Sequence, residues 1–218
     1  MSEANLTLAP DSHASSIAGG HAATMEAPPF AIPSKKLVMW LFIISDACTF
    51  GAMLFAYGYI KNAAADWPHP FESASIMNAL LMTFILVTSS LTILVAVRAA
   101  KNANKSKAIL WTFITIVLGL AFAALHLKEW MGLIGQGVRL FQNPWGSPMF
   151  GASFFAVTGL HLAHVVSGAI ALFVVVMGYK RGRYNSDDLE IWSLYWHFVD
   201  LVWMFVVPMV YLMNVKAG

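Results

Sequence analysis

The sequence predicts an all-α, polytopic membrane helix bundle with five transmembrane helices. Three observations make this prediction: the composition, the apolar runs and the charges between the runs. Apolar residues make up 59% of the 218-residue chain and charged residues only 11%, and the mean hydropathy is +0.68. Soluble domains carry about 25% charged residues. Most of this chain therefore cannot face water, and its solvent is predicted to be lipid.

Five apolar runs are long enough to cross a bilayer, whose hydrocarbon core requires about 20 helical residues. Short polar or charged stretches separate them. The third and fourth runs exceed the required length, so we expect those helices to tilt or to extend past the lipid headgroups. The runs cover residues 37–60, 75–97, 108–134, 148–178 and 190–213.

Lysine and arginine residues are unevenly divided between the two sides of this predicted bundle. One side holds nine of them and the other holds four. Because Lys and Arg concentrate in cytoplasmic loops, the N-terminus is predicted to be cytoplasmic and the C-terminus periplasmic, which an odd number of spans permits. The nine are Lys35, Lys36, Arg98, Lys101, Lys105, Lys107, Lys180, Arg181 and Arg183, and the four are Lys61, Lys128, Arg139 and Lys216.

The chain divides into a predicted flexible cytoplasmic tail over residues 1–34 and a transmembrane domain over residues 35–218. The tail has no Lys or Arg and several Pro, and it lacks the basic start and apolar core of a secretory signal. Because Cys48 is the single cysteine, an intrachain disulfide and a cluster of thiolate metal ligands are excluded. The net charge of +2 is too small to indicate binding to nucleic acid.

Ionisable side chains inside the apolar runs each need a physical reason, because a charge in the membrane core costs about 2.5 to 3.5 kcal/mol on insertion scales. The first run holds Asp46. In the third, fourth and fifth runs such residues come in pairs three positions apart, and this spacing places each pair on one helix face. The pairs are His126 with Glu129, His161 with His164, and His197 with Asp200.

Three interpretations of these groups are open from the residue types alone. Imidazoles from two helices at matching depth are able to ligate a haem. Alternatively, Asp46, His197 and Asp200, continued by His161 and His164, are the groups of a proton route. In the third interpretation the polar side chains hydrogen-bond one another between helices and fix their rotation, at about 1 kcal/mol per contact.

Two further patterns belong to the fourth run and the residues after it. Small residues at every fourth position predict a face for close helix approach, with this helix central in the bundle. A cluster of basic residues after the run follows the cytoplasmic bias of positive charge, and it also suits lipid phosphate groups. The small residues are Gly159, Ala163, Ser167 and Ala171, and the basic residues are Lys180, Arg181 and Arg183.

Residues 195–203, Tyr-Trp-His-Phe-Val-Asp-Leu-Val-Trp, follow Glu190 by five positions. This segment resembles the C-terminal motif of subunit III of haem–copper respiratory oxidases, the cytochrome c and quinol oxidases. Residues 155–168 resemble the histidine-containing helix of that family, and residues 86–92 resemble its Ser-Ser-rich span. Residues 126–130 fall where the family carries a glutamate followed by an aromatic residue. The similarity runs from about residue 36 to residue 213.

The resemblance implies a non-catalytic subunit III of a terminal oxidase in aerobic electron transport, a multi-pass protein of the bacterial inner (plasma) membrane. It implies that this chain carries no redox centre and that haem and copper lie in partner subunits I and II. It also implies bound structural phospholipid and a role in the stability and proton uptake of the catalytic subunit, which reduces oxygen to water. Membership of a larger respiratory supercomplex stays open.

By the same resemblance, Asp46, His197 and Asp200 belong to the polar interior of a lipid cleft, and Lys180 or Arg181 contacts a lipid phosphate. The chain differs from the longer members in having five spans rather than seven, and Asp46 stands where many members have glutamate. Two other functions stay open, a subunit III-like accessory of nitric oxide reductase and an autonomous proton or ion transporter.

Overall fold

The computed structural model describes residues 33–216, and this part of the chain is almost entirely helical. Five helices in it are long and apolar enough to cross a membrane, which confirms the predicted fold class. The orientation of the termini stays a prediction, and residues 1–32, which make up most of the predicted tail, lie outside the described residues. The helices are α1 (Ser34–Ala63), α2 (Ser73–Lys101), α3 (Lys105–Gly135), α4 (Met149–Lys180) and α5 (Ser186–Val206).

Polar caps extend two of the helices beyond the apolar runs. The Asn104 side chain accepts a hydrogen bond of 3.2 Å from the backbone N–H of Lys107 at the start of α3. At the start of α5, Asn185 and Asp188 form a capping box in which each side chain accepts a 3.0 Å bond from the other's backbone N–H. These caps satisfy donors that the first helical turn leaves open. Both helices therefore begin in polar segments, before the first apolar residue.

The fifth predicted run contains Pro208, which lacks a backbone N–H and clashes with the carbonyl four residues earlier in a regular helix. Accordingly, α5 ends at Val206, and the chain continues through a wider π turn (Val207–Tyr211) and a short 3-10 turn (Leu212–Asn214). The whole segment from Ser186 to Asn214 still has the length and composition of a membrane span. The segment thus changes its winding at the proline without ending the span.

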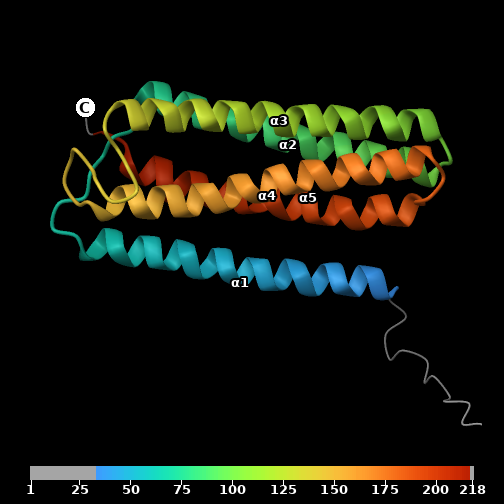
Figure 1. Cartoon of the computed structure of the whole chain (residues 1–218), viewed down its shortest axis with the longest axis horizontal. Helices are drawn as coiled ribbons and strands as arrows, with labels where there is room; N and C mark the ends of the chain where they lie inside the picture. Colours follow the sequence, from blue (N-terminus) through green and yellow to red (C-terminus); the bar gives the residue numbers. More distant parts are fainter. Residues whose placement is uncertain (1–32, 217–218) are drawn as a thin grey trace, which may run out of the picture. The chain divides into compact units, whose positions relative to one another are not determined.

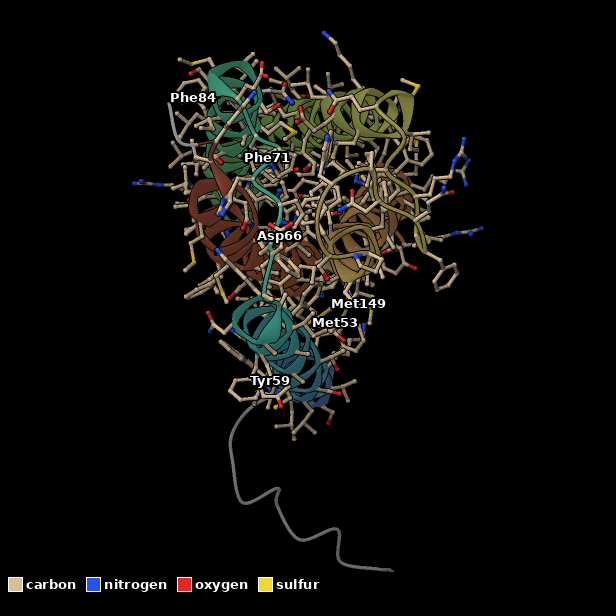
Figure 2. The ribbon with its side chains drawn as sticks, turned by 90° about the vertical axis from the view of Figure 1, so that its left-hand side faces the viewer. Met53, Tyr59, Asp66, Phe71, Phe84 and Met149 are labelled. Carbon is tan, nitrogen blue, oxygen red and sulfur yellow. The ribbon has the colours of Figure 1, made fainter. Side chains whose placement is uncertain are left out.

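Four helices, α2 to α5, form a group in which each packs against two of the others, and α1 lies along one side of the group against α4 and α5 (Figure 1). In the end-on view, α1 stands apart from the other helices, and the α1–α2 connection that carries Asp66 and Phe71 crosses the end of the bundle (Figure 2). The helix α1 is thus the least enclosed of the five, with 22% of its most apolar stretch buried against 39% to 50% for the others.

The two ends of the bundle differ in their side chains. The end formed by the start of α1 and by the α2–α3 and α4–α5 connections is here called the basic end, after Lys36, Lys101 and Arg181. The opposite end, with the α1–α2 and α3–α4 connections, is called the aromatic end, after Trp67 and Trp145. Tryptophan at such an end is typical of the lipid headgroup region.

The indole of Trp196 on α5 lies at the centre of the four-helix group and contacts its three other helices. Its Nε1 donates a 2.9 Å hydrogen bond to Ser89 Oγ on α2. A Cβ added at Gly119 of α3 would lie 2.5 Å from Trp196 Cη2, and one added at Gly168 of α4 would lie 3.2 Å from Cε3. The side chain is only 1% exposed. Close approach of the indole therefore requires glycine at Gly119 and leaves little room at Gly168.

The predicted small-residue packing face of α4 is wrong in part. The helix does contact α1, α3 and α5, but Ala163 and Ser167 are exposed. The buried stripe of α4 instead runs through residues that include Val157, His161 and Gly168. A helix with neighbours on three sides buries a wide stripe of its surface, and a single line of small residues covers only one edge of that surface.

The contact at Gly119 makes a testable prediction. Gly119→Ala is expected to lower the free energy of unfolding by about 1 to 3 kcal/mol, because the added methyl group displaces a locked indole. The measurement is thermal denaturation of the purified protein in detergent. Gly132→Ala on the same helix is the control, because a Cβ there meets nothing within 4 Å and alanine has the higher helix propensity. Equal stability of the two variants would contradict the hypothesis that the Trp196 indole requires glycine at position 119.

Candidate functional site

Asp46 of α1 and His164 of α4 form a pair between their helices. His164 Nε2 lies 3.2 Å from Asp46 Oδ2, and each side chain is 17% exposed. His164 Nδ1 lies 2.8 Å from the Leu160 carbonyl oxygen, which can only accept, so Nδ1 carries a hydrogen. The Nε2 to Oδ2 contact then needs one further proton, bound to either partner. In both cases the pair has no net charge, which lowers the cost of placing it in lipid.

The second predicted pair, His197 and Asp200, bonds to Ser90 of α2. Ser90 Oγ donates a 2.8 Å hydrogen bond to Asp200 Oδ2, and His197 Nδ1 lies 3.2 Å from the same Oγ. Because the hydroxyl hydrogen is used on Asp200, Nδ1–H of His197 donates to Ser90. The three side chains form a short chain of hydrogen bonds between α2 and α5. Ser90 is a site residue that helix-face periodicity does not identify, although the Ser-Ser doublet in an apolar run is a signal for it.

Within residues 33–216, the hydrogen bonds place these groups in two separate clusters, the Asp46–His164 pair and the His197–Ser90–Asp200 chain. The Phe50 ring of α1 lies 5.1 Å from the His164 ring and 6.3 Å from the Phe198 ring, so an apolar ring of α1 packs against α4 and α5 next to the Asp46–His164 pair. A proton route through both clusters therefore requires groups beyond the hydrogen bonds described.

His126 and His161 are fully buried, and neither ring has a hydrogen-bond partner among the described side chains and backbone. Both imidazoles pack against the same two aromatic rings. The Trp203 ring lies 5.5 Å from His126 and 5.0 Å from His161, and the Phe122 ring lies 5.6 Å from each. The Trp203 and Phe122 rings therefore fill part of the space beside both imidazoles. Within residues 33–216, three or more side chains of the metal-binding types do not gather at one place.

Glu129, near the aromatic end of α3, bonds to α2. Its Oε2 accepts a 2.7 Å hydrogen bond from Asn78 Nδ2. One residue further along, Trp130 Nε1 donates a 3.2 Å bond to Thr158 Oγ1 of α4. Glu129 therefore bonds to α2, whereas His126, which lies on the same helix face, packs among aromatic rings. Through Glu129 and Trp130, the segment 126–130 connects α3 to both α2 and α4.

At the basic end, Glu190 bonds to two other helices. Its Oε1 lies 2.9 Å from Lys36 Nζ of α1, and its Oε2 lies 2.6 Å from Lys101 Nζ of α2. Next to it, Asp188 lies 2.8 Å from Lys35 Nζ. The bias of positive charge toward the cytoplasmic side predicts these lysines from topology alone, and in addition three of the nine basic residues form ion pairs with the start of α5. Glu190 thus joins α1 and α2 to α5.

Lys180 and Arg181 lie at the C-terminal end of α4 with exposed side chains. The ion pairs within residues 33–216 involve neither of them. Cations at a helix C-terminus are favourably placed toward the helix dipole. Both remain free to meet an external anion.

A family profile described as cytochrome c oxidase subunit III matches residues 14–215. The chain belongs to the cytochrome c oxidase subunit III family. The match covers the ten residues that the sequence predicts as buried polar or lipid-binding, which are Asp46, His126, Glu129, His161, His164, Lys180, Arg181, Glu190, His197 and Asp200. The family assignment made from the sequence is therefore confirmed, and the chain is a multi-pass membrane protein that belongs to a complex with other oxidase subunits.

The relatives of this chain include subunits of both cytochrome c and quinol oxidases. Cytochrome c oxidase subunit 3 of Alkalihalophilus pseudofirmus is 31% identical over 84% of this chain and 88% of the relative. Quinol oxidase subunit 3 of Bacillus subtilis is 30% identical over 82% and 86%. Cytochrome bo(3) ubiquinol oxidase subunit 3 of Pseudomonas aeruginosa is 32% identical over 80% and 83%. The family likeness thus extends across both classes of electron donor.

The hydrogen-bond chain between α2 and α5 makes a testable prediction. Asp200→Leu is expected to lower the free energy of unfolding by about 1 to 3 kcal/mol, because it leaves the Ser90 hydroxyl without its acceptor. Asp200→Asn keeps an acceptor oxygen and should retain most of the stability. Thermal denaturation of the two variants in detergent checks the prediction. Loss of stability in the asparagine variant equal to that in the leucine variant would show that the carboxylate charge matters, and not the hydrogen bond.

A second prediction concerns α1. Glu190→Gln removes the charge that holds Lys36 and Lys101, so amide hydrogen exchange over residues 34–42 should become faster. The overall free energy of unfolding should change little, because exposed ion pairs contribute only about 0.2 to 1 kcal/mol. Asp187→Asn is the control, since Asp187 lies in the same turn and the ion pairs of the described chain do not include it. Unchanged exchange in the Glu190 variant would mean that α1 is held without this ion pair.

Proposed function

We propose that this chain is the haem-free subunit III of a bacterial haem–copper terminal oxidase in the inner membrane. In this role it packs against subunits I and II, and it stabilises the catalytic subunit that reduces oxygen to water. The observation that supports the proposal most is family membership over residues 14–215. The polar side chains within the bundle add to it, since most of them are engaged in bonds between helices.

The interhelical pairs supply the stabilising part of this function. Asp46–His164 joins α1 to α4, and His197, Ser90 and Asp200 join α2 to α5. Each contact fixes the rotation of its helices at about 1 kcal/mol. A bundle with fixed rotations presents a constant outer surface to the catalytic subunit. The Asp46–His164 pair also holds an exchangeable proton at a partly exposed position, which suits a supporting role in proton uptake next to the catalytic subunit.

Bound phospholipid is the second part of the proposed function. Lys180 and Arg181 are exposed at the end of α4 on the basic end, which is the predicted cytoplasmic side. A guanidinium group binds phosphate through two parallel hydrogen bonds, and each basic residue near an anionic membrane surface contributes about 1 kcal/mol. We assign these two residues to a phospholipid headgroup of the cytoplasmic leaflet.

The test is affinity purification of the tagged chain from its native membranes, followed by mass spectrometry and absorption spectroscopy. The expected result is recovery of a haem–copper subunit with a haem Soret band, together with bound phospholipid. The chain expressed and purified alone should show no Soret band, because in this proposal haem and copper belong to the partner subunits.

Three outcomes would overturn the proposal. Recovery of a catalytic subunit of nitric oxide reductase would assign the chain to that enzyme. A colourless complex without any haem–copper partner would exclude an oxidase role. Proton flux through vesicles that contain the chain alone, abolished by Asp46→Asn, would identify an autonomous transporter.

A further inference from the structure

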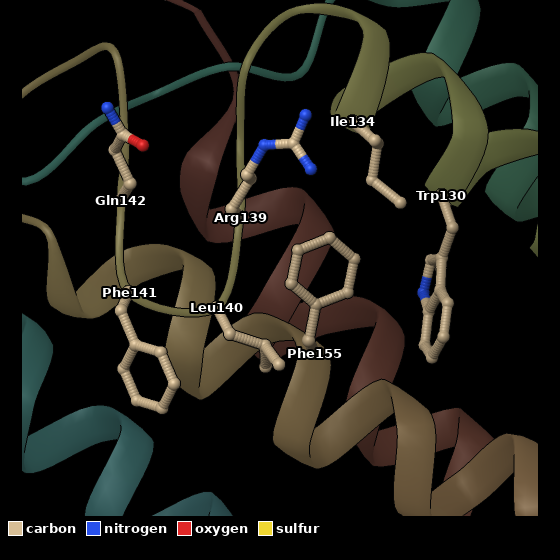
Figure 3. Close-up of a pocket in the computed structure, with 7 residues that line it drawn as sticks. All are labelled: Trp130, Ile134, Arg139, Leu140, Phe141, Gln142 and Phe155. Carbon is tan, nitrogen blue, oxygen red and sulfur yellow. The ribbon is translucent and has the colours of Figure 1, made fainter.

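A hollow of 780 Å³ lies at the aromatic end, between the end of α3, the α3–α4 connection and the start of α4 (Figure 3). Its walls are mostly apolar and aromatic, and a guanidinium and an amide stand on the side of the connection. It shares Trp130 with the Trp130–Thr158 contact described above, but it includes no residue of the Asp46–His164 pair or of the His197–Ser90–Asp200 chain. The lining residues are Trp130, Ile134, Arg139, Leu140, Phe141, Gln142 and Phe155.

The connection that closes this hollow is held in place by the backbone. The N–H of Arg139 donates a 2.7 Å hydrogen bond to the Gln142 carbonyl, so residues 139–142 form a tight turn. A Cβ added at Gly151 of α4 would lie 2.2 Å from the Arg139 carbonyl oxygen, and the adjacent Val138 is fully buried. The backbone at Arg139 is therefore seated directly on α4, and the position from which its side chain extends is fixed.

Arg139 brings an uncompensated positive charge to this hollow. Figure 3 shows its guanidinium extending from the connection toward Ile134, on the side where Phe155 and Trp130 lie. The ion pairs formed within residues 33–216 do not include Arg139. A guanidinium that extends from a fixed backbone position beside an apolar wall matches a ligand that carries an anionic group next to a hydrocarbon chain.

The level of the hollow relative to the membrane indicates that such a ligand is a lipid. Trp130 lines it, and tryptophan concentrates at the level of lipid headgroups. Leu140 is 52% exposed and Phe141 is 90% exposed at the tip of the turn. Two large apolar side chains presented together are unfavourable in water, and both are accommodated when the turn lies at the membrane surface. The guanidinium then stands at phosphate depth, and Ile134 and Phe155 stand below it at the depth of the acyl chains.

We propose that this hollow binds one anionic phospholipid, with its phosphate on Arg139 and the start of an acyl chain against Trp130, Ile134 and Phe155. The site lies at the opposite end of the bundle from Lys180 and Arg181. Its assignment to the outer leaflet rests on the orientation in the proposed function. The phospholipid couples the α3–α4 connection to the bilayer and fills a space that side chains leave open.

The experiment compares variants of the intact native complex in nanodiscs of phosphatidylglycerol and phosphatidylethanolamine in equal amounts, with retained lipid counted by native mass spectrometry. Arg139→Gln is expected to lower the retention of phosphatidylglycerol by about fivefold, since one basic residue at an anionic surface contributes about 1 kcal/mol. Lys128→Gln is the matched control, because Lys128 is an exposed cation of the same end that does not line this hollow. Ile134→Trp, which fills the hollow from the apolar side, should also lose the phospholipid.

Equal retention of phosphatidylglycerol in the wild-type complex and in the Arg139 and Ile134 variants would overturn the site. Loss of phosphatidylethanolamine in place of phosphatidylglycerol would overturn the assignment of an anionic headgroup. A photoreactive residue placed at Phe141 that cross-links to another subunit would show a protein occupant instead. Haem content measured on the same samples separates these outcomes from a failure of the proposed oxidase function, because that failure removes haem from every sample, including the wild type.

Discussion

The spacing of four of the five helices depends on one side chain, the indole of Trp196. Lipid supplies no hydrophobic drive between helices, so close packing and interhelical hydrogen bonds must hold them together. Trp196 supplies both, because its ring lies against Gly119 and Gly168 and its N–H donates to Ser89. His197 follows Trp196 on α5, and Ser90 follows Ser89 on α2. Once Trp196 is seated on Ser89, His197 is brought to Ser90, and the polar chain that ends at Asp200 follows from the same contact.

The helix α1 lies outside this arrangement and is held differently, by polar contacts at three depths. Ion pairs from Lys35 and Lys36 hold its start, and Asp46 bonds to His164 near its middle. At the aromatic end, Asn214 donates to the Tyr57 hydroxyl at 2.5 Å. These contacts add to a narrow buried stripe of α1 that includes Met39, Ile43 and Phe50. They explain how α1 keeps its position while most of its apolar surface stays available to lipid or to another subunit.

The apolar runs were sufficient to predict five spans, because the length of a hydrophobic run is a property of the sequence alone. The partners of the buried groups were not predictable in the same way. Periodicity placed His197 and Asp200 on one face of a helix, but it did not identify the neighbour on which that face lies. Asp46 accordingly bonds to His164 and not to the α5 pair, with which the resemblance had grouped it. The helix ends also differ, since Asn104 and Asn185 start helices from polar positions.

The basic residues of the described chain fall into two groups, those that the protein pairs with its own carboxylates and those that it leaves without such a partner, and each end of the bundle holds both. At the basic end the start of α5 carries Asp188 and Glu190, where acidic groups also favour the helix N-terminus, and these carboxylates neutralise lysines of α1 and α2 inside the protein. At the aromatic end Arg139 extends from a turn seated on α4 by Gly151, and no ion pair of the described chain reaches it. An ion pair within the protein joins two helices. An unpaired cation beside an apolar wall is instead available to bind an anionic lipid of the surrounding membrane.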